Sequence, residues 1–366
     1  MKQFFIIIIC LFHFSILSSQ HTSDSLQTTT TVNGYVDVFY AQDFNNPTSL
    51  KRSYSSNPYR VNQFGLGYAY IEVASKGSRI ESKIALNYGG IVDVMYVNEP
   101  LLYKFIREAS LTFKVNDRFQ ISGGVMPALF GFETFINSNN MHATRAVMCD
   151  FAPDFAAGIT LSYKLSHHWT NKFQINNGWQ VIAETNKNKG IANVLIYENE
   201  ANKNMYNFGL FFVDEAEINH TKQPRFYSNN FAKLNYKNWI FAPMFDYGIQ
   251  KKGDLTENNV TNKEWLSWYS AGLSIRYGIN KNYGVALRYE RTIDKYGIVP
   301  EIKTHTPNGF QMDGLTLTLE YLKVNNCVVR LEARYNNNID GIYESEDGTT
   351  LKKSDLFSYL SAAYKF

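Results

Sequence analysis

Apolar and polar residues alternate along much of this chain, and residues 79–89 show the pattern clearly. Alternation with a period of two is typical of a β-strand, whose successive side chains point to opposite faces. A soluble core would exclude the charged face of this segment, whereas a water-filled lumen accommodates it. The only break in the apolar face is Ser82. The two faces carry Ile80, Ile84, Leu86 and Tyr88 on one side and Arg79, Glu81, Lys83 and Asn87 on the other.

The same alternation recurs in later segments of about 9–12 residues, the length that a tilted strand needs to cross a bilayer. In one of them, Leu317 is expected to face lipid and Thr318 the lumen. The pattern predicts an all-β fold, a transmembrane antiparallel up-and-down β-barrel. Besides residues 79–89, the alternating segments are residues 155–164, 265–277, 283–290, 315–321 and 327–335.

Short polar turns alternate with long connections, as periplasmic turns and outer loops do in such barrels. Seven turns and eight loops predict about 16 strands, enough for an aqueous channel. The weakest strands are residues 191–198 and 226–236, so 14 or 18 strands stay open. The turns are residues 76–78, 116–118, 166–168, 199–203, 237–238, 279–282 and 324–326; the loops are 43–62, 90–104, 128–154, 180–190, 214–225, 251–264, 292–313 and 336–354.

The N-terminus has the features of a secretory signal peptide. Lys2 precedes an almost wholly apolar run from Phe4 to Leu17, and small or polar residues follow it. The run is short for a membrane-spanning helix, so we expect residues 1–19 to be cleaved. Residues 20–366 are then expected to form a single β-barrel domain, because no Pro-rich linker or charge block divides them.

Composition agrees with an exported barrel and argues against a nucleic-acid partner. Removing Lys2 from the 36 basic residues leaves 35 against 33 acidic ones, far from a strongly basic chain. Aromatic residues make up 15% of the chain, with 25 Tyr and 26 Phe, although its mean hydropathy is −0.29. Such aromatics are typical of the girdles at membrane interfaces, so outer-membrane lipid is the expected surrounding.

The last residues form an alternating apolar face that ends in an aromatic. Leu360, Ala362, Tyr364 and Phe366 share this face. It resembles the signal by which the barrel assembly machinery recognises outer-membrane proteins. We therefore expect that machinery to be a partner of the strand that ends in Phe366.

Several short motifs resemble the OmpL-like β-barrel porin family. The resemblance covers most of the chain after the signal peptide and implies a porin-like barrel in the outer membrane. It implies no particular solute and no catalytic residues. The motifs are Gly34-Tyr35-Val36-Asp37-Val38-Phe39-Tyr40 with Asp43-Phe44-Asn45, Asn62-Gln63-Phe64, Gly124-Val125-Met126-Pro127, Phe130-Gly131-Phe132-Glu133 with Arg145, and Asn176-Asn177-Gly178-Trp179-Gln180.

Loop 128–154 is the best candidate for a constriction. It is the third long loop and carries Glu133, Arg145 and Asp150. A long loop that folds into the lumen could set ion preference through such charges. The alternative is a surface loop that caps the mouth of the barrel.

The late strands add inward-facing charges that could line the pore. By parity Arg276, Arg288, Arg330 and Arg334 face inward, and arginine suits carboxylate or phosphate. Acidic residues of the same strands also face inward, so cross-strand ion pairs that brace the wall are the alternative to an anion-selective strip. These acidic residues are Glu290, Glu320 and Glu332.

The sequence gives little reason to expect an enzyme. His142, His220 and His305 lie in predicted outer loops without metal-ligand spacing, and no nucleophile and base can be paired. We therefore expect no catalytic residue, metal or other cofactor. The sequence leaves open whether Cys149 and Cys327 form a disulfide.

Passive transport is the function that these features favour. A porin would pass small hydrophilic solutes through a water-filled channel, with at most mild charge selectivity. Many barrels of this size are trimers, which leaves a homotrimer open. A surface barrel that serves as an adhesin or assembly protein, without an open pore, is the alternative function.

Overall fold

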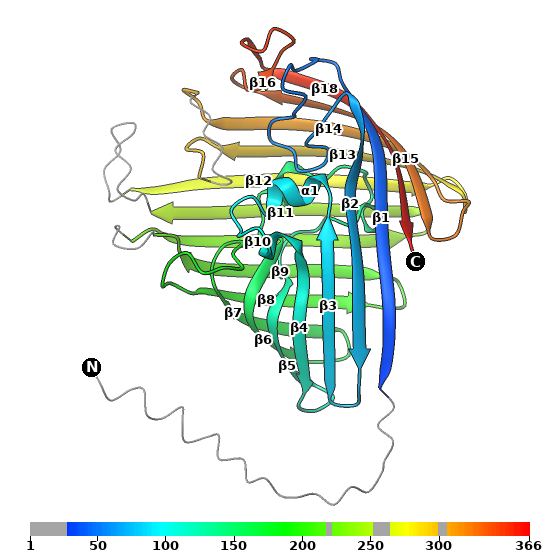
Figure 1. The fold of residues 1–366 in the computed structure, drawn as a ribbon, viewed down its shortest axis with the longest axis vertical. Helices are drawn as coiled ribbons and strands as arrows, with labels where there is room; N and C mark the ends of the chain where they lie inside the picture. The colour runs from blue at the N-terminus through cyan, green and yellow to red at the C-terminus, as the bar shows by residue number, and fades with distance from the viewer. Residues whose placement is uncertain (1–27, 217–221, 252–263, 299–305) are drawn as a thin grey trace, which may run out of the picture.

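The chain folds into a closed antiparallel β-barrel (Figure 1). The computed structural model describes residues 28–216, 222–251, 264–298 and 306–366. The predicted signal peptide, residues 1–19, lies outside these residues. The strands of the barrel are β1 (Thr29–Asp43), β2 (Gln63–Lys76), β3 (Ile80–Tyr88), β4 (Ile106–Lys114), β5 (Phe119–Pro127), β6 (Phe155–Lys164), β7 (Trp169–Asn176), β8 (Gly190–Asn199), β9 (Asn204–Asp214), β10 (Pro224–Tyr236), β11 (Trp239–Lys251), β12 (Trp265–Gly278), β13 (Tyr283–Asp294), β14 (Phe310–Tyr321), β15 (Cys327–Asn338) and β18 (Ser354–Lys365).

Each strand pairs with its neighbours in sequence, and β1 pairs with β18 to close the ring. Residues Gly34 and Phe366 exchange two backbone hydrogen bonds, of 2.8 and 3.0 Å, at this closure. Within the described residues sixteen strands form the barrel, which confirms the predicted number. Closure leaves no strand edge, so backbone groups in the membrane find partners inside the wall.

The connections alternate between short and long as predicted. Seven short turns lie at one end of the barrel. The strands β8 and β10 are regular and pair with a neighbour on both sides. The long connections at the other end contain short elements of their own. These are α1 (Gly90–Met95), η2 (Tyr103–Phe105), η3 (Asn137–Asn139), α2 (Val147–Asp150), β16 (Tyr343–Glu344) and β17 (Leu351–Lys352).

None of the helices found in the described ranges is long and apolar enough to span a bilayer.

The two faces of the wall agree with the predicted parity. On β14, Leu317 is 46% exposed on the outside, whereas Thr318 is fully buried inside. Phe155 is an exception, because alternation places it on the apolar outer face but the side chain is buried. Its ring stacks on that of Tyr96, with the two ring centroids 4.1 Å apart. The loop that contains α1 supplies this cover at the end of β6, which local periodicity does not reveal.

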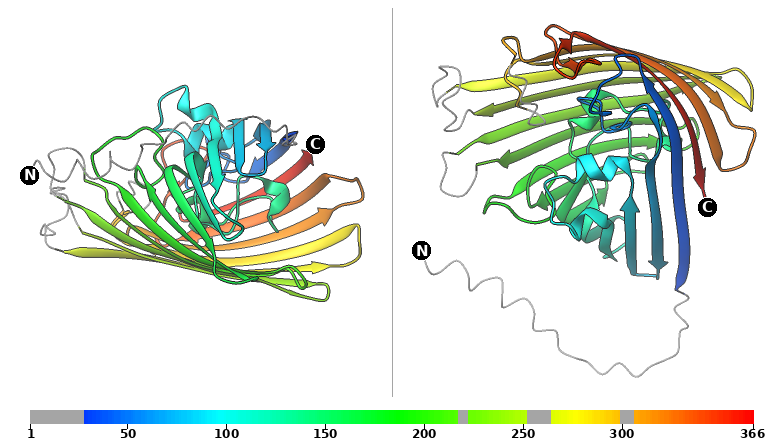
Figure 2. Two further views of the ribbon diagram at one scale, coloured as in Figure 1. Left: turned by 90° about the horizontal axis from the view of Figure 1, so that it is seen from below. Right: turned by 45° about the horizontal axis from the view of Figure 1, so that its top comes forward.

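Aromatic side chains form two belts on the outside of the wall. Near the short turns, the rings of Tyr283 and Tyr321 lie 5.3 Å apart. Near the long loops, the ring of Phe226 lies 4.7 Å from Phe212 and 5.9 Å from Trp265. Two aromatic belts with leucines between them are what a barrel is expected to place at the two membrane interfaces. Figure 2 shows the barrel from two further directions.

Candidate functional site: the loop inside the barrel

Loop 128–154 lies against the inner wall of the barrel. At its start, the ring of Phe130 packs on the rings of Phe211 of β9 and Tyr227 of β10. The distances between ring centroids are 5.6 and 5.7 Å. The backbone N–H of Gly131 donates to Asn229 of β10 at 3.1 Å. These contacts place the start of the loop against the inner faces of β9 and β10. That the loop narrows a channel stays a prediction.

The middle of the loop binds β13 and β15 through its own backbone. Carboxylate oxygens of Glu332 accept from the N–H groups of Ala143 and Thr144, at 2.7 and 3.2 Å. The carboxylate of Glu290 accepts from the N–H of Val147 at 2.7 Å. Two glutamates of the wall thus satisfy buried N–H groups that an irregular loop cannot pair within itself.

Arginines of the wall donate hydrogen bonds to carbonyl and carboxylate oxygens of the same loop. Arg334 donates to the carbonyl oxygen of Arg145 at 2.7 Å, and Arg330 donates to that of Asn140 at 2.6 Å. Arg288 donates to both carboxylate oxygens of Glu133, at 2.9 and 3.1 Å. Because these groups are charged and fully or almost fully buried, each bond is stronger than a neutral one.

The remaining charges of the wall neutralise one another. Arg334 pairs with Glu290 and Arg330 with Glu320, both at 2.7 Å, and Arg276 also contacts Glu320. The alternative of cross-strand ion pairs thus describes these side chains better than a free basic strip does. A buried charge would be costly without such partners.

Arg145 holds the loop together from within. Its guanidinium lies 2.7 Å from Asp154 and 3.3 Å from Asp150. Asp150 also accepts from the backbone N–H of Ser56, at 3.0 Å, and so links this loop to the connection between β1 and β2. The loops near the outer mouth therefore support one another.

His142 lies at the centre of this contact and is fully buried. Its Nδ1 is 2.8 Å from the hydroxyl of Thr318 and 4.0 Å from Glu332. Burial, together with Arg288, Arg330 and Arg334, lowers the pKa of His142 well below its usual range. The imidazole is therefore neutral near pH 7 and acts as a hydrogen-bond partner of the wall.

Most residues that the sequence predicts to line the pore meet in this contact. Eight of the ten are buried between loop and wall, and Asp150 and Arg276 are partly exposed. Contact with a passing solute stays a prediction for them, and their burial does not favour it. The eight buried residues are Glu133, Arg145, Arg288, Glu290, Glu320, Arg330, Glu332 and Arg334.

Other residues in this contact were not predicted from the sequence. Asn229 and Asn137 bond to the loop and the wall, and Arg330 donates to the backbone oxygen of Asn137 at 2.7 Å. Backbone acceptors leave no signal in a sequence. Parity does place Asn229 on the inner face of β10, which is the one signal that could have found it. Cys149, in this loop, and Cys327 are both free thiols.

The opposite wall carries charged side chains that reach water. The side chains of Lys83, Lys114 and Glu81 are 45, 25 and 29% exposed. Lys114 and Glu81 pair at 2.5 Å. This part of the inner wall therefore differs from the dry contact beneath loop 128–154.

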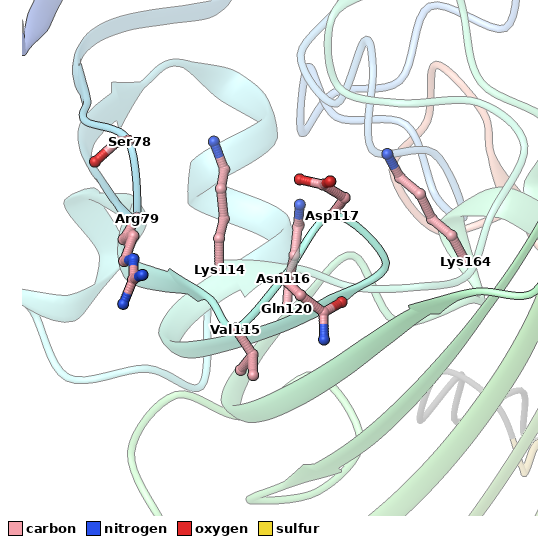
Figure 3. A pocket seen from close by; sticks show the side chains of 8 residues that line it. All are labelled: Ser78, Arg79, Lys114, Val115, Asn116, Asp117, Gln120 and Lys164. Atoms are coloured by element: carbon pink, nitrogen blue, oxygen red, sulfur yellow. The ribbon is translucent and has the colours of Figure 1, made fainter.

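A cavity of about 520 Å³ opens at the end with the short turns, between β3 and β6 (Figure 3). Three basic residues from neighbouring parts of the wall line it, Arg79, Lys114 and Lys164, with Asp117 as the acidic residue. In Figure 3 the side chains of Lys114, Asp117 and Lys164 point the same way. The polar lining suits water and hydrophilic solutes rather than an apolar ligand.

Comparison with solved structures finds a porin and other outer-membrane proteins with the same fold. An anion-selective porin from Comamonas acidovorans is 12% identical, with a TM-score of 0.62, and the match covers 93% of this chain and 100% of that one. The outer-membrane channel DcaP of Acinetobacter baumannii is 10% identical, with a TM-score of 0.58 and coverage of 93% and 97%. OmpT of Vibrio cholerae, in a structure described as a trimer form, is 10% identical, with a TM-score of 0.55 and coverage of 93% and 99%.

Sequence comparison identifies the family. No curated protein matches the chain by sequence. The family described as "Putative beta-barrel porin-2, OmpL-like" matches residues 29–366, which is nearly the whole chain and includes every strand of the barrel. The chain belongs to this family of porins, and it is an outer-membrane porin.

Proposed function

We propose that small hydrophilic solutes cross this porin along the inner faces of β3–β6, beside the docked loop 128–154. The observation that carries the proposal is the unequal burial of the inner wall. Charged groups of β13–β15 are sealed under the loop, while on β3 the side chain of Lys83 is exposed and that of Glu81 is partly exposed. Water and ions need a path with such exposed polar groups.

The charges along this path suggest a mild preference for anions. Basic side chains outnumber acidic ones around the cavity of Figure 3, which Arg79, Lys114 and Lys164 line together with Asp117. Glu81 offsets part of this charge through Lys114. Interspersed charges weaken a field of one sign, so the preference should be small.

Reversing two charges on the path should reverse this preference. In the double variant Lys83→Glu, Lys164→Glu, we expect the reversal potential in a salt gradient to shift toward cations, because acidic groups then dominate the lining. Planar-bilayer recordings measure it. The matched control is Lys237→Glu, Lys353→Glu, which makes the same change at exposed positions in connections between strands.

An equal shift in both double variants would mean that solutes do not pass along β3–β6. Wild-type protein that gives no conductance steps would reject the open pore itself. The alternative of a barrel that serves as an adhesin or assembly protein would then be favoured.

The partners proposed here follow from the barrel and its last strand. Outer-membrane lipid surrounds the apolar wall between its aromatic belts. A homotrimer stays a prediction, supported by the trimer form of one structure with this fold. The barrel assembly machinery is proposed to recognise β18 and its final aromatic.

Loss of the final aromatic should impair assembly. The ring of Phe366 covers Gly34, where an added Cβ would lie 2.1 Å from the ring carbon Cζ, and its backbone bonds to the same residue. Deleting Phe366 should therefore lower the amount of heat-modifiable barrel in outer-membrane fractions several-fold. Phe366→Tyr keeps the ring and should assemble normally. Normal assembly of the deletion would count against the proposed signal.

A further inference from the structure

A group of polar side chains lies on the outer face of β7–β10, where lipid contact is expected. Asn171 of β7 and Asn193 of β8 exchange two side-chain hydrogen bonds, both of 3.2 Å. On β10, the amide nitrogen of Asn230 donates to the hydroxyl of Ser228 at 2.8 Å. We call these four residues the outer polar patch.

Strand register places the patch near the middle of the wall. Asn193 lies level with Leu210 of β9, which in turn lies level with Ser228. The next level joins Asn171 to Asn230 through Leu195 and Phe208. The patch therefore spans four adjacent strands, and β9 crosses it with apolar side chains.

The facing of these residues follows from their neighbours. Asn193 has the parity of Ile191, which is exposed on the outside, whereas Ala192 and Val194 are buried against the loop within the barrel. Asn230 is offset by one residue from Asn229, which bonds the loop inside. The amides thus point away from the lumen.

Hydrocarbon is a poor surrounding for these groups. An amide offers two donors and two acceptor lone pairs, and within the described residues no hydrogen bond reaches Oδ1 of Asn230. Lipid tails cannot satisfy the remaining groups, and exposing them there has a cost in free energy. By contrast, the lipid-facing residues of β14 in its middle are Leu315, Leu317 and Leu319.

We infer that the outer polar patch is the contact surface for a second copy of this chain, in a two-fold dimer rather than in a homotrimer. Amides both donate and accept, so the patch is complementary to itself, and a two-fold axis would bring it against its own copy. Polar side chains stabilise contacts between protein segments in membranes in the same way. Leu210, 63% exposed at the centre of the patch, would then lie near Leu210 of the second copy.

Cysteine cross-linking in outer membranes tests this contact with the full chain. In a Cys327→Ser background, which removes the less buried native thiol, Leu210→Cys should give a disulfide-linked dimer upon oxidation. The matched control is Leu317→Cys on β14, 46% exposed on the outside and away from the patch, which should stay monomeric. Adding Asn171→Leu, Asn193→Leu and Asn230→Leu to Leu210→Cys should lower the dimer yield at least ten-fold.

Heat-modifiability on gels checks that every variant folds, and channel conductance is recorded in parallel. Retained conductance without cross-linking at Leu210→Cys would overturn the contact but leave the porin function intact. Equal cross-linking at Leu210→Cys and Leu317→Cys would show random collision and overturn it as well. A threefold assembly brings two different surfaces together, so trimers by chemical cross-linking without a Leu210→Cys dimer would also reject the two-fold contact.

Discussion

Replacing Arg288 with methionine is expected to lower the free energy of unfolding by about 3–5 kcal/mol. The guanidinium is fully buried, and it neutralises Glu133 of the loop at 2.9 Å and lies 3.5 Å from Glu290 of the wall. Without the guanidinium, the carboxylates of Glu133 and Glu290 stay buried between loop and wall with one positively charged partner fewer. Denaturant titration of the folded barrel in vesicles measures the change.

The matched control for this prediction is Arg276→Met. The side chain of Arg276 is partly exposed, and its partner Glu320 keeps a second bond to Arg330. We expect a loss of about 1–2 kcal/mol in that variant. Similar losses of unfolding free energy in Arg288→Met and Arg276→Met would show that the buried ion pairs between loop and wall stabilise the barrel no more than a partly exposed ion pair does.

Release of the loop should also be visible in transport. Because Arg288 holds Glu133 and the carbonyl oxygen of Thr144, its loss frees the middle of the loop from β13. Arg288→Met should therefore give noisier single-channel currents than the wild type, while Arg276→Met should not. Currents as quiet as those of the wild type would mean that the remaining contacts hold the loop in place.

Placing a lysine on the lipid face should destabilise the barrel by about 2–4 kcal/mol. Leu111, in the middle of β4, is 63% exposed on the outside, so Leu111→Lys moves a charge into hydrocarbon. The neighbouring Thr112 faces the lumen and lies opposite Glu81 of β3. Thr112→Lys should change stability by about 1 kcal/mol at most, because the new ammonium meets water and a carboxylate.

Urea titration of both variants in the same vesicles measures the difference. Equal losses for Leu111→Lys and Thr112→Lys would contradict the assignment of the two faces of β4. A larger loss of stability for Thr112→Lys than for Leu111→Lys would mean that Thr112, and not Leu111, faces lipid.

Parity alone does not predict how severe an inward substitution is. Alternation treats Thr318 and Thr112 alike, as lumen-facing threonines. In the structure Thr318 is fully buried, with its hydroxyl bonded to Glu332 at 2.7 Å and to His142 of the loop. A lysine at Thr318 would therefore disrupt the loop contact, although the same change at Thr112 meets open lumen.

The sequence by itself determined the barrel and the two faces of its wall, and it predicted about 16 strands while leaving 14 or 18 open. These features depend on local rules: a period of two sets the facing, and turn residues mark where strands end. The prediction that Phe155 is exposed on the outer face is wrong because its burial does not depend on a local rule. A loop distant in sequence covers its ring. Residues 1–19 lie outside what the structure describes, so the signal peptide stays a prediction.

Only the tertiary structure decided which part of the inner wall is dry. Charges on β13–β15 and charges on β3–β6 look alike in the sequence, because both alternate with apolar residues. The difference arises where loop 128–154 docks: Glu290 and Glu332 accept its N–H groups, and Arg330 and Arg334 bind its carbonyl oxygens. These contacts join residues more than 140 positions apart and use backbone groups that every residue carries. No local pattern encodes them, whereas the closed ring of strands brings them together.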